Sequence, residues 1–136
     1  MPDKEGKTFI DTNILIYLSH DPEKGPKVAD ALLKIPEPTI STQVINEFCN
    51  VSLKRFKLSP ARVGELVKAF SELYSIVSIN SGTTLKGLQV NEKYKYSFYD
   101  SMIIAAALES GCTTLLTEDL QHGQTIERRL KITNPF

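Results

Sequence analysis

Short β-prone runs alternate with stretches of helical periodicity along the chain, and this alternation limits the folds that the sequence can adopt. Four runs are typical of buried strands: residues 8–10, 39–41, 76–79 and 114–116. Between them, apolar residues recur every three or four positions, as expected for helices that bury one face. Strands that alternate with helices form right-handed βαβ units around a mainly parallel sheet. We therefore predict a three-layer α/β/α domain with four or five strands, the fifth at residues 131–133.

Local signals mark where several of the predicted helices begin and end. Ser59 followed by Pro60 is typical of a helix start, because proline is well tolerated in the first turn. Ser97 is predicted to cap a later helix that continues through the apolar run at residues 102–108. Gly111 is expected to end that helix.

The composition fits one compact domain in a reducing compartment. The chain has 136 residues, of which 41% are hydrophobic and 24% charged, and these values exclude a disordered or fibrous protein. Its 16 basic and 16 acidic residues cancel, which excludes a uniformly basic surface but not a local basic patch. Cys49 and Cys112 match neither a disulfide framework nor a zinc motif.

No segment of the sequence has the features of a membrane span or a signal peptide. The longest apolar run, residues 102–108, is far shorter than the ~20 residues that a span requires. Residues 1–7 lack the apolar core of a signal peptide. We therefore expect a single cytoplasmic domain over residues 1–136, with residues 1–6 as a flexible tail and no contact with a membrane.

Four acidic residues occupy positions that a parallel sheet would bring to one edge. Asp11 directly follows the first predicted strand, and Asp119 comes three residues after the fourth. Glu47 lies in the second turn of the helix after the second strand, and Asp100 lies in the first turn of its helix. Ligands of open parallel sheets bind outside the carboxyl ends of the strands, so we expect these carboxylates to converge there.

Each of these acids also has a simple local explanation. Asp11 and Asp119 could cap a helical turn, and Asp100 could complete a capping box at a helix start. Glu47 shares a polar helix face that could simply be solvated. For each residue alone these roles are the more frequent ones, and only the convergence of all four favours a common site.

Converging carboxylates favour a hard divalent cation. Two like charges ~4 Å apart repel by about 4 kcal/mol at an effective dielectric constant of 20, so such a group takes up protons or binds cations. Oxygen ligands suit Mg²⁺ or Mn²⁺, and two such ions would balance four carboxylates and could promote phosphodiester hydrolysis. Zinc is disfavoured because His20 and His122 are the only histidines and neither has a ligand partner at zinc-motif spacing.

The ordered set of motifs resembles the PIN-domain family, and more narrowly the VapC-type toxins of toxin–antitoxin pairs. The similarity extends from residue 9 to residue 136, and each motif is weak alone while their order and spacing are specific. The motifs are Phe9-Ile10-Asp11-Thr12-Asn13, Glu47, Ser97-Phe98-Tyr99-Asp100, Leu115-Leu116-Thr117-Glu118-Asp119 and Ile132-Thr133-Asn134-Pro135-Phe136.

This resemblance implies a Mg²⁺- or Mn²⁺-dependent endoribonuclease that forms a homodimer and is inhibited by a cognate antitoxin protein. The implied catalytic and metal-binding acids are Asp11, Glu47, Asp100 and Asp119. Residues implied to support the metal site by hydrogen bonds are Thr12, Asn13 and Thr117. The choice of Asp119 over the adjacent Glu118 rests on the resemblance alone.

Other function classes fit less well. A phosphoacceptor signalling domain needs an acidic pair after the first strand and a lysine after a late strand, whereas Asp11 stands alone and residues 117–119 include no lysine. A haloacid-dehalogenase-like phosphatase needs a second aspartate where Asn13 stands. A catalytically silent PIN module that binds RNA or protein stays open, and so does DNA as the substrate.

Overall fold

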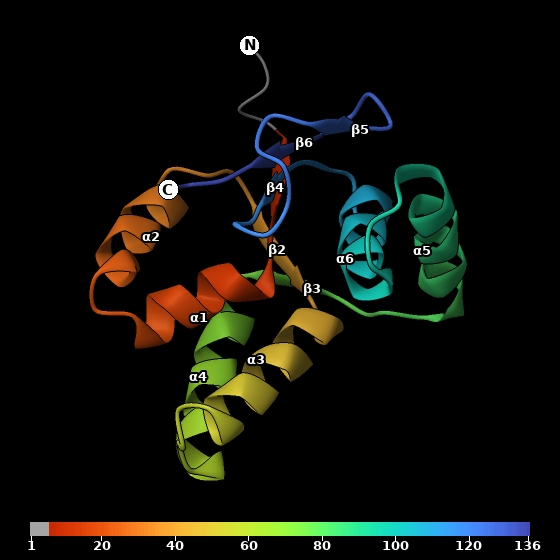
Figure 1. Cartoon of the computed structure of the whole chain (residues 1–136). Coiled ribbons are helices and arrows are strands. Elements are labelled where there is room, and N and C mark those ends of the chain that lie inside the picture. Colours follow the sequence, from red (N-terminus) through yellow and green to blue (C-terminus); the bar gives the residue numbers. More distant parts are fainter. Residues whose placement is uncertain (1–5) are drawn as a thin grey trace.

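The computed structural model describes residues 6–136, so the predicted tail at residues 1–6 lies outside the described residues except for Gly6. Helices and strands alternate as the sequence predicts (Figure 1). In chain order, the elements are β1 (Lys7–Ile10), α1 (Thr12–His20), α2 (Lys24–Leu33), β2 (Pro38–Ser41), α3 (Thr42–Lys54), α4 (Pro60–Leu73), β3 (Ser75–Val77), α5 (Ser81–Tyr94), α6 (Phe98–Glu109), β4 (Cys112–Leu116), β5 (Thr125–Ile126) and β6 (Leu130–Thr133).

The sheet is mainly parallel, which confirms the predicted fold class. Its strand order is β3-β2-β1-β4-β6-β5, and every neighbouring pair is parallel except β5 and β6. The two-residue strand β5 is an addition to the four or five strands predicted. It pairs with β6 across a turn in which Glu127 and Arg128 both have positive φ, at 54° and 57°. Neither residue type is typical of such a turn, so the sequence carries no signal for this hairpin.

Helices pack on both sides of the sheet. Figure 1 shows α5 and α6 together on one side, α1 and α2 on the other, and α3 with α4 as a projecting two-helix arm. Residues 101–108 of α6 are all buried, because this helix is apolar on every face and lies between the sheet and α5. Within the described residues, no helix combines the length and apolar character that a membrane crossing requires.

The contact between α1 and α3 determines where Glu47 lies. The ring of His20, at the end of α1, stacks on Phe48 and Phe56 with centroid distances of 5.7 and 4.4 Å. Its Nε2 atom lies 3.0 Å from the Ser52 hydroxyl, and burial lowers the pKa of the imidazole, which favours the neutral ring. This packing holds α3 against α1, with Glu47 beside the first turn of α1.

Candidate active site

Asp11 lies directly after β1, where it is the N-cap of α1 and almost completely buried. Its Oδ1 atom accepts a hydrogen bond from the Thr12 backbone N–H at 2.6 Å. Its Oδ2 atom accepts one from the Thr117 hydroxyl at 2.8 Å. The capping role that the local sequence predicts is therefore present, and it holds the carboxylate at the carboxyl end of the strand.

Asn13 connects α1 to the loop that follows β4. Its Nδ2 atom lies 3.0 Å from Asp119 Oδ2, 3.2 Å from the Thr117 hydroxyl and 3.5 Å from Asp11 Oδ2. Its Oδ1 atom accepts a hydrogen bond from the Glu118 backbone N–H at 3.2 Å. One amide therefore orients acids that are more than 100 residues apart in the chain.

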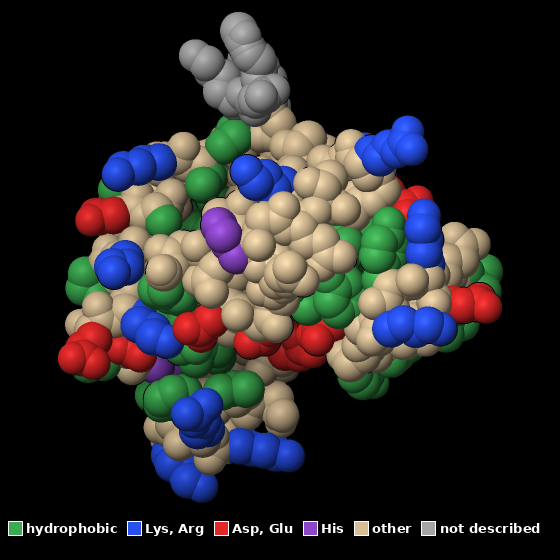
Figure 2. Space-filling view, turned by 45° about the horizontal axis from the view of Figure 1, so that its top comes forward, with side chains coloured by type: hydrophobic (Ala, Val, Ile, Leu, Met, Phe, Trp, Pro, Cys, Tyr) green, Lys and Arg blue, Asp and Glu red, His purple; other side chains and the backbone are tan. Residues whose placement is uncertain are grey.

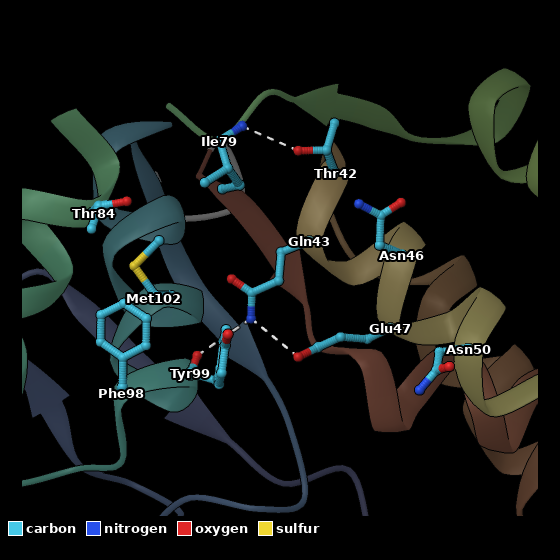
Figure 3. A pocket seen from close by; sticks show the side chains of 10 residues that line it. All are labelled: Thr42, Gln43, Asn46, Glu47, Asn50, Ile79, Thr84, Phe98, Tyr99 and Met102. Atoms are coloured by element: carbon cyan, nitrogen blue, oxygen red, sulfur yellow. Dashed lines mark hydrogen bonds between the residues drawn. The ribbon is translucent and has the colours of Figure 1, made fainter. Parts of the chain in front are cut away.

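Glu47 reaches this group from the second turn of α3. Its Oε1 atom accepts a hydrogen bond from the Thr12 hydroxyl at 2.6 Å. The Gln43 side chain, one turn earlier on α3, donates to Glu47 Oε2 at 3.2 Å and to the Tyr99 carbonyl oxygen at 3.4 Å (Figure 3). Gln43 thus links α3 to the start of α6. We did not predict this contact, although the four-residue spacing from Glu47 is compatible with it.

Asp100 lies in the first turn of α6, as predicted. Its backbone N–H donates to the hydroxyl of the N-cap residue Ser97 at 3.2 Å. Partial burial raises the pKa of its carboxyl, and the negative charges of Asp119 and Glu47 raise it further. The structure therefore brings Asp100 within electrostatic range of the other acids.

Burial dominates the electrostatics of Asp11. It raises the pKa of this carboxyl to about 7, against the opposing hydrogen bonds from Thr117 and Thr12, and Asp119 and Glu47 add to the rise. In the described part of the chain, the ion pairs are Lys24–Glu118, Arg62–Glu65 and Lys93–Glu127. None of them includes Asp11, Glu47, Asp100 or Asp119, so among the described residues these four acids form no ion pair.

The donor chemistry of these acids fits a hard divalent cation such as Mg²⁺. Figure 2 shows acidic side chains gathered across the middle of one face of the molecule. Among residues 6–136, however, no three Asp, Glu, His or Cys side chains already converge closely enough to hold a metal ion. The carboxylates thus lie at one edge of the sheet without ion pairs to the other described residues, but they do not form a finished metal cage.

Glu118, although adjacent to Asp119, points away from this group. Its carboxylate accepts hydrogen bonds from the Tyr17 hydroxyl and, at 3.0 Å, from the Lys24 ammonium. These two donors lower the pKa of Glu118. The tertiary structure therefore separates two adjacent acids that the local sequence does not distinguish.

Two depressions meet at Glu47. The smaller, of about 360 Å³, contains Thr12, Asn13, Glu47, Arg55 and Asp119 in its lining. The larger, of about 610 Å³, extends along α3 toward the start of α6 and shares Glu47 and Asn50 with the smaller one. A chain-like ligand could therefore pass over the acidic group and occupy both depressions.

The fold is similar to that of several solved toxin structures. A toxin–antitoxin complex from Klebsiella pneumoniae matches with a TM-score of 0.74 and 22% identity, over 96% of this chain and 98% of that chain. VapC20 from Mycobacterium tuberculosis, described as a sarcin-ricin loop cleaving toxin, matches with a TM-score of 0.70 and 16% identity, over 90% and 99%. DNA-bound VapBC from Salmonella typhimurium gives 0.68 and 19%, over 96% and 98%.

These identities are low, so the similarity to the solved structures establishes the fold alone. A comparison with curated proteins finds no significant match. The family model described as PIN domain matches residues 8–126, which include all four acids and most of the sheet. The chain therefore belongs to the PIN domain family.

Proposed function

We propose that this protein is a Mg²⁺- or Mn²⁺-dependent endoribonuclease, formed by a single PIN domain over residues 1–136. The observation that carries the proposal is the gathering of Asp11, Glu47, Asp100 and Asp119 at one sheet edge, where none of them forms an ion pair with another residue of the described range 6–136. Acids that serve only as caps or solvated side chains have no need to come together from distant parts of the chain, because their mutual repulsion opposes folding.

The metal would be held by Asp11, Asp100 and Asp119, with Glu47 at the side of the attacking water. When bound there, a divalent cation neutralises phosphate charge and favours the ionisation of water. Glu47 orients this water and accepts its proton, and the water oxygen attacks phosphorus in line with the leaving O3′ atom. The P–O3′ bond breaks as the new P–O bond forms, and the leaving O3′ atom takes a proton from solvent. The products are a 5′-phosphate and a 3′-hydroxyl.

The supporting residues keep these acids in position. Thr12 and Gln43 each donate to one oxygen of the Glu47 carboxylate, which leaves that side chain little freedom to rotate. Thr117 holds Asp11, and Asn13 holds Asp119. Restricting the acids in this way reduces the reorganisation that the reaction requires.

We further propose that the protein acts in the cytoplasm as a homodimeric toxin and that a cognate antitoxin inhibits it. The similar structures from Klebsiella pneumoniae and Salmonella typhimurium are a toxin–antitoxin complex and a DNA-bound VapBC complex, which supports a partner of this kind. The VapC20 structure is of a toxin that cleaves the sarcin-ricin loop, which supports RNA as the substrate class.

The test is cleavage of a structured RNA pool in the presence of Mg²⁺, Mn²⁺ or EDTA. We expect cleavage that requires metal and falls at least about a hundredfold in Asp11→Asn and Asp100→Asn. Asp30→Asn, at an exposed position on α2, is the matched control and keeps full activity. His122→Ala is also expected to remain active, because histidine does not activate the water in this mechanism.

Circular dichroism verifies that each variant is folded. Cleavage that continues in EDTA, or in folded Asp11→Asn and Asp100→Asn, would contradict the proposal. RNA binding without cleavage in any metal would instead indicate a silent PIN-type binding module.

A further inference from the structure

The larger depression beside Glu47 has the composition of a nucleobase site. One wall is a face of α3 that carries Asn46, Glu47 and Asn50, and the opposite wall includes Phe98 and Tyr99 at the start of α6 (Figure 3). The cavity volume of about 610 Å³ is within the range of small-molecule sites. It adjoins the acidic group directly, because Glu47 belongs to both.

The aromatic wall is open to solvent. Tyr99 is 65% exposed and Phe98 is 37% exposed, and their rings meet edge to face at a centroid distance of 5.2 Å. Large aromatic side chains left this exposed beside a cavity offer a surface on which a flat ring can stack. Among residues 6–136, those that line the cavity include no lysine, arginine or histidine, so it favours a neutral ring over a phosphate.

The opposite wall supplies amide groups that are exposed to solvent. In the described part of the chain, the amides of Asn46 and Asn50 make no hydrogen bond to another protein group, whereas Gln43 donates to Glu47 and the Tyr99 carbonyl. Each free amide can both donate and accept. An asparagine amide matches the adjacent donor and acceptor on an adenine edge.

We propose that this cavity binds one unpaired base of the substrate, preferably adenine, next to the phosphodiester that is cut. The inference rests on the proposed function and adds to it a reason for sequence preference. Single-stranded RNA is read in this way elsewhere, by stacking of a splayed base on aromatic rings and by hydrogen bonds to its edge. The backbone of the same strand would continue over the acidic group into the smaller depression, where Arg55 lies.

The first experiment measures cleavage of a randomised single-stranded RNA and maps the bases that flank each cut. We expect a preference for adenine at one fixed position in the wild type. Tyr99→Ala raises KM roughly tenfold with little change in kcat, because stacking is lost, while Tyr99→Phe retains the ring and stays close to wild type. Asn46→Ala removes the adenine preference. Gln89→Ala, an exposed amide on α5 outside this cavity, leaves both KM and base preference unchanged.

A second experiment measures base binding without any cleavage. In EDTA, adenosine 5′-monophosphate is titrated into the protein, and the side-chain amide signals of Asn46 and Asn50 are followed by NMR. Ribose 5-phosphate, which lacks the base, is the control and leaves these signals in place. Loss of the shifts in Tyr99→Ala would show that the base stacks there.

The outcomes separate this inference from the proposed function. If RNA is cleaved but Tyr99→Ala and Asn46→Ala change neither KM nor base preference, the base site is wrong and the nuclease stands. If adenosine 5′-monophosphate shifts both amides while no RNA is cleaved, the nuclease is wrong and the base site stands. If the two variants alter only the oligomeric state or antitoxin binding, the cavity belongs to a protein interface and the inference is overturned.

Discussion

The pKa shifts of two acids at the carboxyl edge of the sheet are opposite in direction to those of two glutamates on the neighbouring loops. Burial raises the pKa of Asp11 and Asp100, and neither forms an ion pair in the part of the chain that the structure describes. Glu118 and Glu127 instead have lowered pKa values, because Tyr17 and Lys24 donate to the first and Lys93 and Tyr94 to the second. The paired glutamates join loops to helices with little cost. The unpaired acids weaken the fold, which is expected where a cation from outside the chain completes the site.

The largest expected difference between an unpaired and a paired acid is in the cleavage rates of variants at two adjacent residues. We expect Asp119→Asn to lower the single-turnover rate of RNA cleavage at least about a hundredfold, because it removes an acid from the unpaired group. Glu118→Gln retains a rate within about threefold of wild type, since Glu118 binds Lys24 and Tyr17 instead. Equal losses in the two variants would show that pairing does not distinguish the functional acid.

Stability without metal is the second way to test the comparison. The folded pKa of Asp11, about 7, exceeds its unfolded value of 3.8, so the folded state binds the proton more tightly. The contribution of this group to the free energy of unfolding is fully present below about pH 4 and is lost as pH rises toward 7. Asp11→Asn avoids this loss and is expected to be more stable than wild type by about 2–4 kcal/mol at pH 8 in EDTA.

Urea unfolding at pH 4 and pH 8 measures this difference. The comparison of wild type with Asp11→Asn cancels the titration of groups that do not interact with Asp11. A stability difference that does not grow between the two pH values would mean that Asp11 is not held in a protonating environment.

Metal binding is expected to reverse the loss of stability that the charged Asp11 carboxyl causes without metal. Mg²⁺ at about a hundred times its Kd stabilises a protein with one site by about 2.7 kcal/mol, provided that the unfolded chain does not bind it. We expect Mg²⁺ to raise the Tm of wild type by several degrees and to leave that of Asp100→Asn unchanged. The reference for both proteins is Ca²⁺-free buffer with EDTA. An equal rise in both proteins would place the cation elsewhere.

The smallest expected effect is the change in Tm when one of the paired glutamates, Glu127, is replaced. The pKa of Glu127, about 2, lies below the unfolded value of 4.5, so its contribution is present above pH 4.5 and is lost as pH falls toward 2. Because this pair is on the surface, Glu127→Gln is expected to lower Tm at pH 7 by about 1 °C or less. A larger loss in calorimetry would show that the pair anchors the β5–β6 turn more strongly than its exposure implies.

Much of the fold could be predicted because its signals are local. The strand at Lys7–Ile10 and the helices capped by Ser59 and Ser97 follow from periodicity and capping chemistry. The hairpin of β5 could not be predicted, because Glu127 and Arg128 adopt positive φ without the glycine or asparagine that usually indicates it. There, pairing with β6 outweighs the intrinsic preference of the two residues.

The sequence by itself determined the α/β class and the placement of Asp11 and Asp119 after strands, because strand and helix ends depend on neighbouring residues. Only the tertiary structure decided which acids stay unpaired. It turned Glu118 toward Lys24, joined Gln43 to Glu47 and Tyr99, and opened a cavity between α3 and α6. These contacts and this cavity depend on packing between segments far apart in the chain, which a local sequence pattern does not predict.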